Sequence, residues 1–229
     1  MFQVNAEIIY NNKIKKNYFE IALSATQIAK TAVPGQFVNI KVSDDSEPLL
    51  RRPLSIHRIG RQVTKSPSHQ SKAKRQIVML YEVVGKGTEI LSKRKPCEYL
   101  DVIGPLGNGF DYEGRKTIDD GPIVLVAGGM GTAPLVFLAE RLRERGTKDE
   151  RRRTIVLIGA KTKDSILCEK EFKDFGCEVK IATDDGSRGF KGYVSDLLKK
   201  ELSTIDHRLS TAMPKQPSPQ QSLLSAPKS

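Results

Sequence analysis

Two adjacent arginines, Arg51 and Arg52, stand at the start of the strand-like stretch LLRRPLSI, which covers residues 49–56. A guanidinium presents a planar fork of N–H donors that matches phosphate oxygens. The stretch therefore indicates a site for an anionic ligand. A solvated edge strand that carries two surface cations is the alternative.

A glycine-rich turn lies within the sequence VLVAGGMGTAPLVFLAERL. Gly128, Gly129 and Gly131 separate a short apolar run from a helix that is predicted to begin near Thr132. Glycine allows a tight turn and a close approach of the backbone to a ligand, and a helix start offers N–H groups that suit a pyrophosphate. The G-G-x-G spacing differs from the G-x-G-x-x-G dinucleotide fingerprint, and such turns also occur without a ligand.

Two further loops have residue types that suit a nucleotide. In GKGTEIL, Gly87 and Thr88 open a predicted helix and could bind a phosphate, although a plain capped turn is the alternative. In TDDGSRGFKG, which follows a predicted parallel strand, the candidates for ribose and phosphate contacts are Asp184, Asp185, Ser187 and Arg188. A polar loop without a ligand explains this second segment equally well.

The sequence gives little support to hydrolytic or metal chemistry. The histidines at positions 57, 69 and 207 are scattered, with no sequence context typical of a Ser or Cys nucleophile, and His57 is interpreted as structural. Cys97, Cys168 and Cys177 form no CxxC pair and have no histidine at ligand spacing, so neither a zinc site nor a disulfide framework is predicted. Any redox chemistry would belong to bound cofactors.

The positive charge is concentrated in one segment. The net charge is +11, and residues 51–95 hold twelve Lys or Arg against two acids, which is +10. Such a block can bind nucleic acid, a phosphate-bearing cofactor or an acidic partner. Aromatic residues make up only 6% of the chain, so single-strand stacking is disfavoured and we expect no nucleic-acid partner.

The N-terminal sequence and the hydropathy of the chain indicate its cellular location. No apolar run approaches the ~18 residues that cross a bilayer, and the start MFQVNAEIIY lacks a basic region followed by an apolar core. We therefore expect a cytoplasmic protein without membrane contact.

The elements that would position these residues fall into two halves. Residues 1–107 contain a short helix near 88–93, a hairpin loop at 60–75, and six strand-like segments: QVNAEIIY, NYFEIAL, QFVNIKV, PLSIHRI, QIVMLYEVV and EYLDVIG. Many short antiparallel strands with turns predict a closed β-barrel.

The pattern changes in the second half, over residues 115–207. Three predicted strands, PIVLVAG, RTIVLIGA and CEVKIAT, are each followed by a helix, the last of them near residues 194–202. This alternation predicts a parallel α/β sheet. The fold class is thus β plus α/β, a barrel followed by a nucleotide-binding α/β domain. Residues 208–229 are rich in Ser, Pro and Gln and are predicted to be a disordered tail.

Taken in order, the motifs PGQFVNI, LLRRPLSI, LYEVVGKGT, GPLGNGF, VAGGMGTAPL and DDGSRGFKG resemble the ferredoxin–NADP reductase superfamily. More narrowly, the chain resembles the electron-transfer subunits of NAD-linked bacterial dihydroorotate dehydrogenase, over about residues 4–202. The resemblance implies FAD as cofactor, NAD(H) as substrate, and electron transfer to a dihydroorotate dehydrogenase catalytic subunit in a heterotetramer of pyrimidine biosynthesis.

The resemblance also implies roles for single residues. Arg52 would pair with the FAD diphosphate, and the remaining FAD contacts would be Pro53, Leu54, Ser55, Leu80, Tyr81, Glu82, Gly87 and Thr88. The NAD(H) contacts would be Gly128, Gly129, Gly131, Thr132, Pro134 and Asp185. Arg51 would be a flanking surface cation.

The family also carries a [2Fe–2S] cluster on four cysteines near its C-terminus. After Leu202 this chain reads STIDHRLSTAMPKQPSPQQ without a cysteine, so we expect no cluster and an incomplete α/β domain, as after a truncation or frameshift. Two alternatives to the electron-transfer subunit follow. One is a non-catalytic FAD-binding remnant, and the other is a reductase subunit of another NAD(P)H-linked complex.

Overall fold

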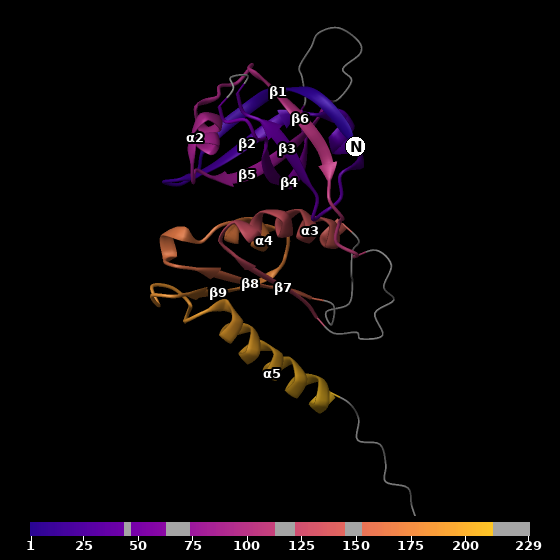
Figure 1. The fold of residues 1–229 in the computed structure, drawn as a ribbon. Coiled ribbons are helices and arrows are strands. Elements are labelled where there is room, and N and C mark those ends of the chain that lie inside the picture. The colour runs from indigo at the N-terminus through magenta and orange to yellow at the C-terminus, as the bar shows by residue number, and fades with distance from the viewer. Residues whose placement is uncertain (44–46, 63–73, 113–121, 145–152, 213–229) are drawn as a thin grey trace, which may run out of the picture.

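The computed structural model describes residues 1–43, 47–62, 74–112, 122–144 and 153–212. They form two stacked parts, a closed barrel and a parallel sheet, with helices α3 and α4 between barrel and sheet and α5 on the other face of the sheet (Figure 1). Within these ranges, no helix is both long and apolar enough to cross a membrane.

The barrel closes because six antiparallel strands pair in the order β1-β2-β5-β4-β3-β6. These strands are β1 (Phe2–Lys13), β2 (Tyr18–Ser24), β3 (Phe37–Lys41), β4 (Arg52–Gln62), β5 (Lys74–Glu82) and β6 (Tyr99–Leu106). Inward-pointing residues such as Leu23, Ile56 and Ile77 are fully buried in one core. Helices α1 (Thr26–Thr31) and α2 (Lys86–Lys93) pack onto this core through Ile28 and Leu91.

The second part is a parallel sheet with the strand order β10-β9-β8-β7. Its elements are β7 (Ile123–Gly128), η1 (Gly129–Gly131), α3 (Thr132–Glu144), β8 (Thr154–Ala160), η3 (Lys163–Ser165), α4 (Glu169–Asp174), β9 (Glu178–Thr183), β10 (Phe190–Lys191) and α5 (Val194–Ala212). Strand β8 is apolar on both faces because both are covered. Ile155 and Leu157 pack with α5, whereas Val156 and Ile158 pack with α3 and α4.

Helix α3 is buried on two sides. Its Val136 and Ala139 belong to the core under the sheet, and its Phe137 belongs to the core of the barrel. Ala133, in the first turn, packs against Leu80 of β5. The apolar run APLVFLA therefore reflects a helix that is the shared wall of both parts.

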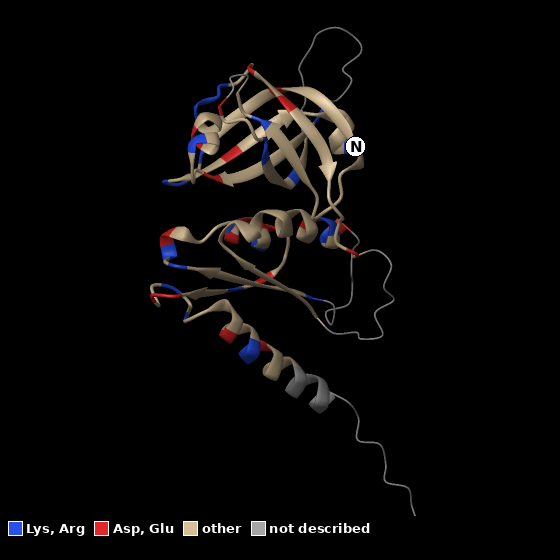
Figure 2. Cartoon of the chain, in the orientation of Figure 1, with Lys and Arg blue, Asp and Glu red and all other residues tan. Residues whose placement is uncertain are grey.

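The basic segment does not give the barrel a uniformly positive surface. Its cations pair with acids from other parts of the described chain: Arg51 with Asp101, Arg58 with Glu20, and Lys86 with Glu47. Figure 2 shows positive and negative residues side by side on the barrel.

The predicted fold class is confirmed, and every predicted strand is present. Some details differ. The sequence does not predict α1 or β10, and α5 continues to Ala212 instead of ending near residue 202, so the start of the predicted disordered tail is helical. The β4–β5 hairpin is tighter than predicted, because the strands pair as far as Gln62 and Lys74. The loop tip at 63–73 and the tail at 213–229 lie outside the described residues.

Replacing Phe137 with Ala should lower the free energy of unfolding by about 3–5 kcal/mol, since a fully buried ring is removed from the barrel core. Chemical denaturation measures this loss. Tyr193→Ala is the control, because Tyr193 is 67% exposed and its loss should change stability by less than about 0.5 kcal/mol. Equal small effects of both changes would contradict the packing of α3 into the barrel.

Candidate functional site

The barrel wall opens where strands β4 and β5 separate. The ladder between them begins at the pair Ile56–Met79 and runs toward the hairpin. On the other side of that pair, residues 52–55 pair with β3 and residues 80–82 pair with β2, so in the described chain these two segments have no ladder with each other. The N–H and C=O groups along one edge of each segment therefore make no ladder hydrogen bonds between β4 and β5 and need other partners. We refer to this place as the barrel opening.

Arg52 lies at the barrel opening, beside the first turn of α2. An ideal Cβ on Gly87 would lie 2.1 Å from Arg52 Nε, so the guanidinium occupies space that only glycine leaves empty. Arg52 donates to the carbonyl of Leu50 at 2.6 Å, and no carboxylate of the described residues pairs with it. A guanidinium with five donors therefore retains capacity for an anion.

Arg51, the neighbouring cation, is held by the barrel itself. Its guanidinium contacts the Asp101 carboxylate at 2.5 Å and donates to the Asp101 backbone carbonyl at 2.9 Å. The hydrogen bond from Arg51 holds the pKa of Asp101 below its ordinary value of 3.8. Of the two adjacent arginines, Arg52 is thus the one presented to a ligand.

The other β4 and β5 candidates divide between the opening and the core. Pro53 and Ser55 share the outer face of β4, whereas Leu54 is 8% exposed and its side chain belongs to the barrel core. Tyr81 is also buried, and its hydroxyl donates to Asn11 Oδ1 at 2.9 Å. Leu54 and Tyr81 are therefore placed to meet a ligand through their backbones.

Leu80, Glu82 and Thr88 complete the candidates at the opening. Leu80 is 3% exposed and faces the α/β part, where it packs with Ala133. Glu82 ends β5 and is half-buried. The Thr88 hydroxyl accepts hydrogen bonds from two backbone N–H groups just before α2, at 3.0 and 3.3 Å, so it stabilises the start of the helix.

The glycine turn, residues 128–131, lies at the carboxyl end of β7. Gly129 has φ +50°, which favours glycine, and an ideal Cβ on Gly129 or Gly131 would meet no protein atom within 4 Å. Thr132 is fully buried and donates from Oγ1 to the carbonyl of Gly129 at 2.8 Å, which closes the turn. Pro134 lies in the first turn of α3, where its missing N–H is not needed. The space over the turn is open toward a ligand.

The loop after β9 reaches the same edge of the sheet as the glycine turn, because β7, β8 and β9 are parallel. Asp184 and Asp185 are exposed there. Hydrogen bonds from Ser187 hold the pKa of Asp185 below its ordinary value of 3.8. Arg188 pairs with Glu169 at 2.8 Å, so this cation already has an anionic partner.

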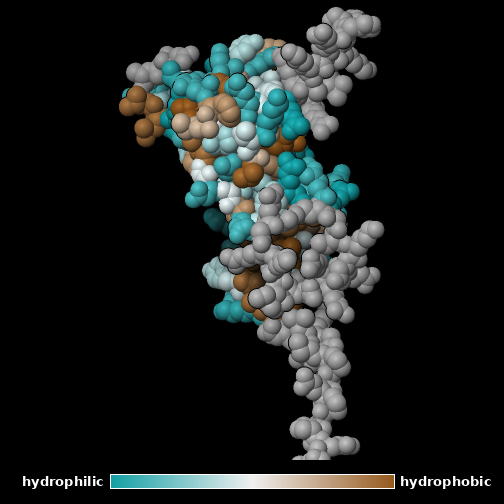
Figure 3. Space-filling view, turned by 90° about the vertical axis from the view of Figure 1, so that its right-hand side faces the viewer, coloured by the Kyte–Doolittle hydropathy of each residue, from teal (hydrophilic) through white to brown (hydrophobic). Residues whose placement is uncertain are grey.

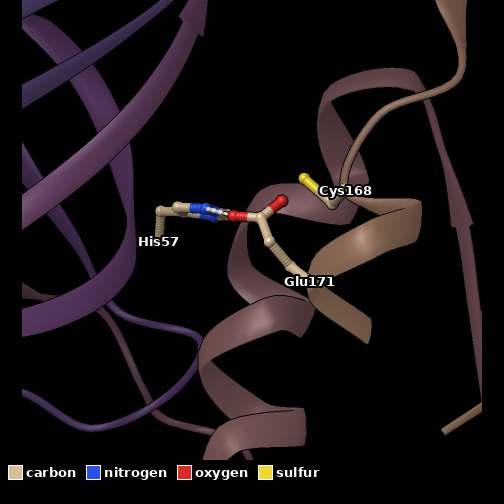
Figure 4. A group of neighbouring side chains, drawn as sticks. All are labelled: His57, Cys168 and Glu171. Atoms are coloured by element: carbon tan, nitrogen blue, oxygen red, sulfur yellow. Dashed lines mark hydrogen bonds and ion pairs between the residues drawn. The ribbon is translucent and has the colours of Figure 1, made fainter. Parts of the chain in front are cut away.

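His57 is a residue that the sequence assigns only a structural role. It is 1% exposed and lies where the barrel meets α3 and α4. Its Nδ1 is 3.0 Å from the backbone oxygen of Ala133, and its Nε2 is 2.9 Å from Oε1 of Glu171 (Figure 4). The sequence interprets His57 as structural because it alternates with Ile56 on a predicted strand, but no local signal predicts partners 76 and 114 residues away.

Charged groups of both parts surround the pair of His57 and Glu171. Burial alone would raise the pKa of Glu171, but the hydrogen bond from His57 and the charge of Arg58 hold it below its ordinary value of 4.5. Arg58 also pairs with Glu20 at 2.8 Å and lies 3.8 Å from Glu171. Burial raises the pKa of the Cys168 thiol, so that side chain stays protonated at neutral pH.

The donor atoms of His57, Cys168 and Glu171 lie within 4.8 Å of one another, a grouping that can bind a metal ion. Here both ring nitrogens of His57 already face acceptors, and the positive Arg58 lies 3.8 Å from Glu171. A metal would also need the thiolate, which burial disfavours. These residues therefore form a hydrogen-bonded junction between the two parts.

The cysteines do not fit an iron–sulfur cluster. Cys97 is exposed before β6, whereas Cys168 precedes α4 and Cys177 precedes β9. A [2Fe–2S] centre needs four thiolates or an equivalent ligand set, and the sequence has three cysteines. By themselves, the cysteines of this chain do not supply a cluster.

Curated relatives cover most of the chain. The electron transfer subunit of dihydroorotate dehydrogenase B (NAD(+)) from Desulforamulus reducens is 39% identical over 198 residues, which are 86% of this chain and 68% of the relative. The subunit of the same name from Geobacillus sp. (strain WCH70) is 37% identical over 206 residues, which are 90% of this chain and 73% of the relative. No protein-family model matches the chain.

Solved structures share the two-part fold. The NADH-dependent reduced ferredoxin–NADP oxidoreductase aligns with a TM-score of 0.66 and 31% identity, over 87% of this chain and 63% of that one. The chain therefore spans less than two thirds of that protein. Ferredoxin–NADP+ reductase from Plasmodium falciparum aligns with a TM-score of 0.66 over 91% of this chain and 82% of its own, at 12% identity, which speaks for the fold alone.

Glu171→Gln should reduce the change in the free energy of unfolding when the pH falls into the acidic range. The pKa of Glu171 is lowered in the folded protein, so its stabilisation is complete above about 4.5 and is lost as the pH falls through the lower folded pKa. At pH 7 the variant should be less stable by about 1 kcal/mol, the scale of a partly exposed charged hydrogen bond.

Urea denaturation of both proteins between pH 7 and pH 3 measures this difference. Protonation of other carboxylates, such as Asp101, lowers the free energy of unfolding equally in both proteins. The two curves of stability against pH should therefore converge below pH 4.5. A constant difference across this range would contradict the charged state of Glu171.

Proposed function

The chain belongs to the family of electron transfer subunits of dihydroorotate dehydrogenase B (NAD(+)), and on that premise we propose that it holds FAD at the barrel opening and accepts electrons from NADH at the glycine turn. One observation carries the proposal. Leu80 of the opening packs in one hydrophobic cluster with Met130 and Ala133, which flank the end of the turn. Two separately recognisable nucleotide sites thus meet at one junction, as hydride transfer between two cofactors requires.

The residues at the opening fit FAD. Bound FAD supplies the chemistry that connects a hydride donor to an electron acceptor. Arg52 pairs with the diphosphate, and Gly87 leaves the space that the guanidinium and the phosphates need. Leu50 and Val84, 73% and 78% exposed, lie within three residues of Arg52 and Gly87 and offer apolar contact to a planar ring.

On the face of the barrel that Figure 3 shows, hydrophobic residues lie among hydrophilic ones and form no single continuous patch. The exposed Leu50 and Val84 near a cationic residue suit a ligand with both a ring and a charge.

The residues at the sheet edge fit NADH. The glycine turn leads into the N-terminus of α3, whose free N–H groups and positive dipole end suit a pyrophosphate. Thr132 and Pro134 hold the shape of that turn. The exposed carboxylate of Asp185 suits a ribose hydroxyl.

The acceptor side of the proposal rests on the names of the relatives. We propose a dihydroorotate dehydrogenase catalytic subunit as the partner, in a heterotetramer of pyrimidine biosynthesis. The cysteines favour a second candidate, an FAD-binding chain that passes no electrons onward, because they do not supply a cluster for the relay.

Arg52→Ala should weaken FAD binding about 10- to 100-fold, because a hydrogen bond to a charged group contributes about 1.5–3 kcal/mol. Arg51→Ala is the matched control, since that guanidinium is held by Asp101 and should affect FAD less than about threefold. Equilibrium dialysis followed by flavin absorbance measures both dissociation constants. Equal effects of the two changes would contradict the assignment of the diphosphate to Arg52.

Gly131→Val should raise the NADH concentration needed to reduce the flavin at least about tenfold while FAD stays bound. An ideal Cβ at Gly131 meets no protein atom within 4 Å and Gly131 is not among the glycines with positive φ, so the change should obstruct the ligand more than the fold. Anaerobic titration with NADH, followed by the loss of flavin absorbance, measures the change. Unchanged NADH dependence would contradict the site, and wild-type protein that holds FAD but is not bleached by NADH would favour the second candidate.

A further inference from the structure

His57 joins the strand of the barrel opening to the helix of the glycine turn. It follows Ser55 by two residues on β4, and its Nδ1 contacts the carbonyl of Ala133, which follows Gly131 by two residues. We propose that His57 is a positioning residue that fixes the glycine turn relative to the β4 segment Arg52–Ser55. The part of this inference that concerns hydride transfer rests on the function proposed above.

The hydrogen bonds of His57 define a single orientation of its ring. Both ring nitrogens face acceptors, the carbonyl of Ala133 at 3.0 Å and the carboxylate of Glu171 at 2.9 Å. Both contacts are directional, and the carboxylate is a strong acceptor for a ring N–H. The His57 side chain is 1% exposed, so its ring is shielded from water, whereas the Glu171 side chain is 28% exposed.

Directional bonds add to the apolar contacts of α3. Burial of Phe137 and Ala133 against the barrel holds the helix by close packing but is non-directional, whereas a hydrogen bond specifies which backbone group lies against the strand. A slide of one ångström would break a 3.0 Å hydrogen bond to the first turn of the helix. The same slide would displace the turn by one ångström, which is enough to impair a transfer that depends on contact between reacting atoms.

A second bridge between the two parts provides a comparison. Lys15 of the barrel donates to the carbonyl of Asp164 at 3.1 Å and to the carbonyl of Ile166, both in the loop before α4. The hydrogen bonds of this bridge end at Asp164 and Ile166 and not at α3 or the glycine turn. Its removal should therefore loosen the junction without moving the turn, which makes Lys15→Met the matched control.

The first test needs no cofactor. Amide hydrogen exchange of the full chain, followed by mass spectrometry, should show at least about fivefold faster exchange at residues 128–135 in His57→Gln, with the barrel strands unchanged. Glutamine keeps one donor but cannot reach both acceptors. Glu171→Gln, a change at a side chain that is 28% exposed, tests the same bridge if His57→Gln does not fold. Lys15→Met should leave residues 128–135 unchanged.

The second test uses the chain loaded with FAD and mixed anaerobically with NADH. In His57→Gln the flavin reduction rate at saturating NADH, and the long-wavelength absorbance from stacking of the nicotinamide on the flavin, should fall at least about tenfold, with FAD occupancy unchanged. Uniformly faster exchange, or wild-type values in both tests from a folded variant, would overturn the positioning role. Locally faster exchange in a protein whose wild-type form NADH does not reduce would retain the positioning role and reject the proposed function.

Discussion

The burial of helix α3 on two sides is the constraint on which the rest of the structure depends. The first half of α3, APLVFLA, is apolar around its circumference and cannot leave a face in water, so the barrel and the sheet both pack on it. Phe137 enters the barrel core, while Val136 and Ala139 face the sheet. Because the glycine turn directly precedes α3, this packing also places the turn near the barrel opening.

Polar contacts add direction to that packing. Glu20, Arg58 and Glu171 alternate in charge across the junction, and His57 hydrogen-bonds to Glu171. Replacing buried ion pairs with apolar groups is often neutral or stabilising in proteins, so such an arrangement is weak support for stability. Its acceptors and donors do specify which face of α4 and which carbonyl of α3 meet the barrel. The junction is therefore better explained by geometry than by free energy of folding.

The sequence predicts what local patterns determine. The strands follow from alternating and continuous apolar runs, and the glycine turn follows from residue types that few other structures require. Arg51 and Arg52 are neighbours of the same type, and their different roles arise only from the register that brings Asp101 to one and Gly87 to the other. The partners of His57 are likewise set by tertiary packing. The same reason explains why α1, six residues long, and β10, two residues long, were not predicted.

The barrel opening has an energetic consequence under the proposed function. A closed barrel pairs all of its strand edges, but here β4 and β5 part beyond Ile56 and Met79, which leaves two backbone edges without a ladder between them. Unpaired backbone groups that are shielded from water are unfavourable, and a ligand rich in donors and acceptors can satisfy them. A ligand that binds the folded chain alone stabilises it by mass action. The hydrogen bonds that hold a ligand in the opening would then also raise the free energy of unfolding of the barrel.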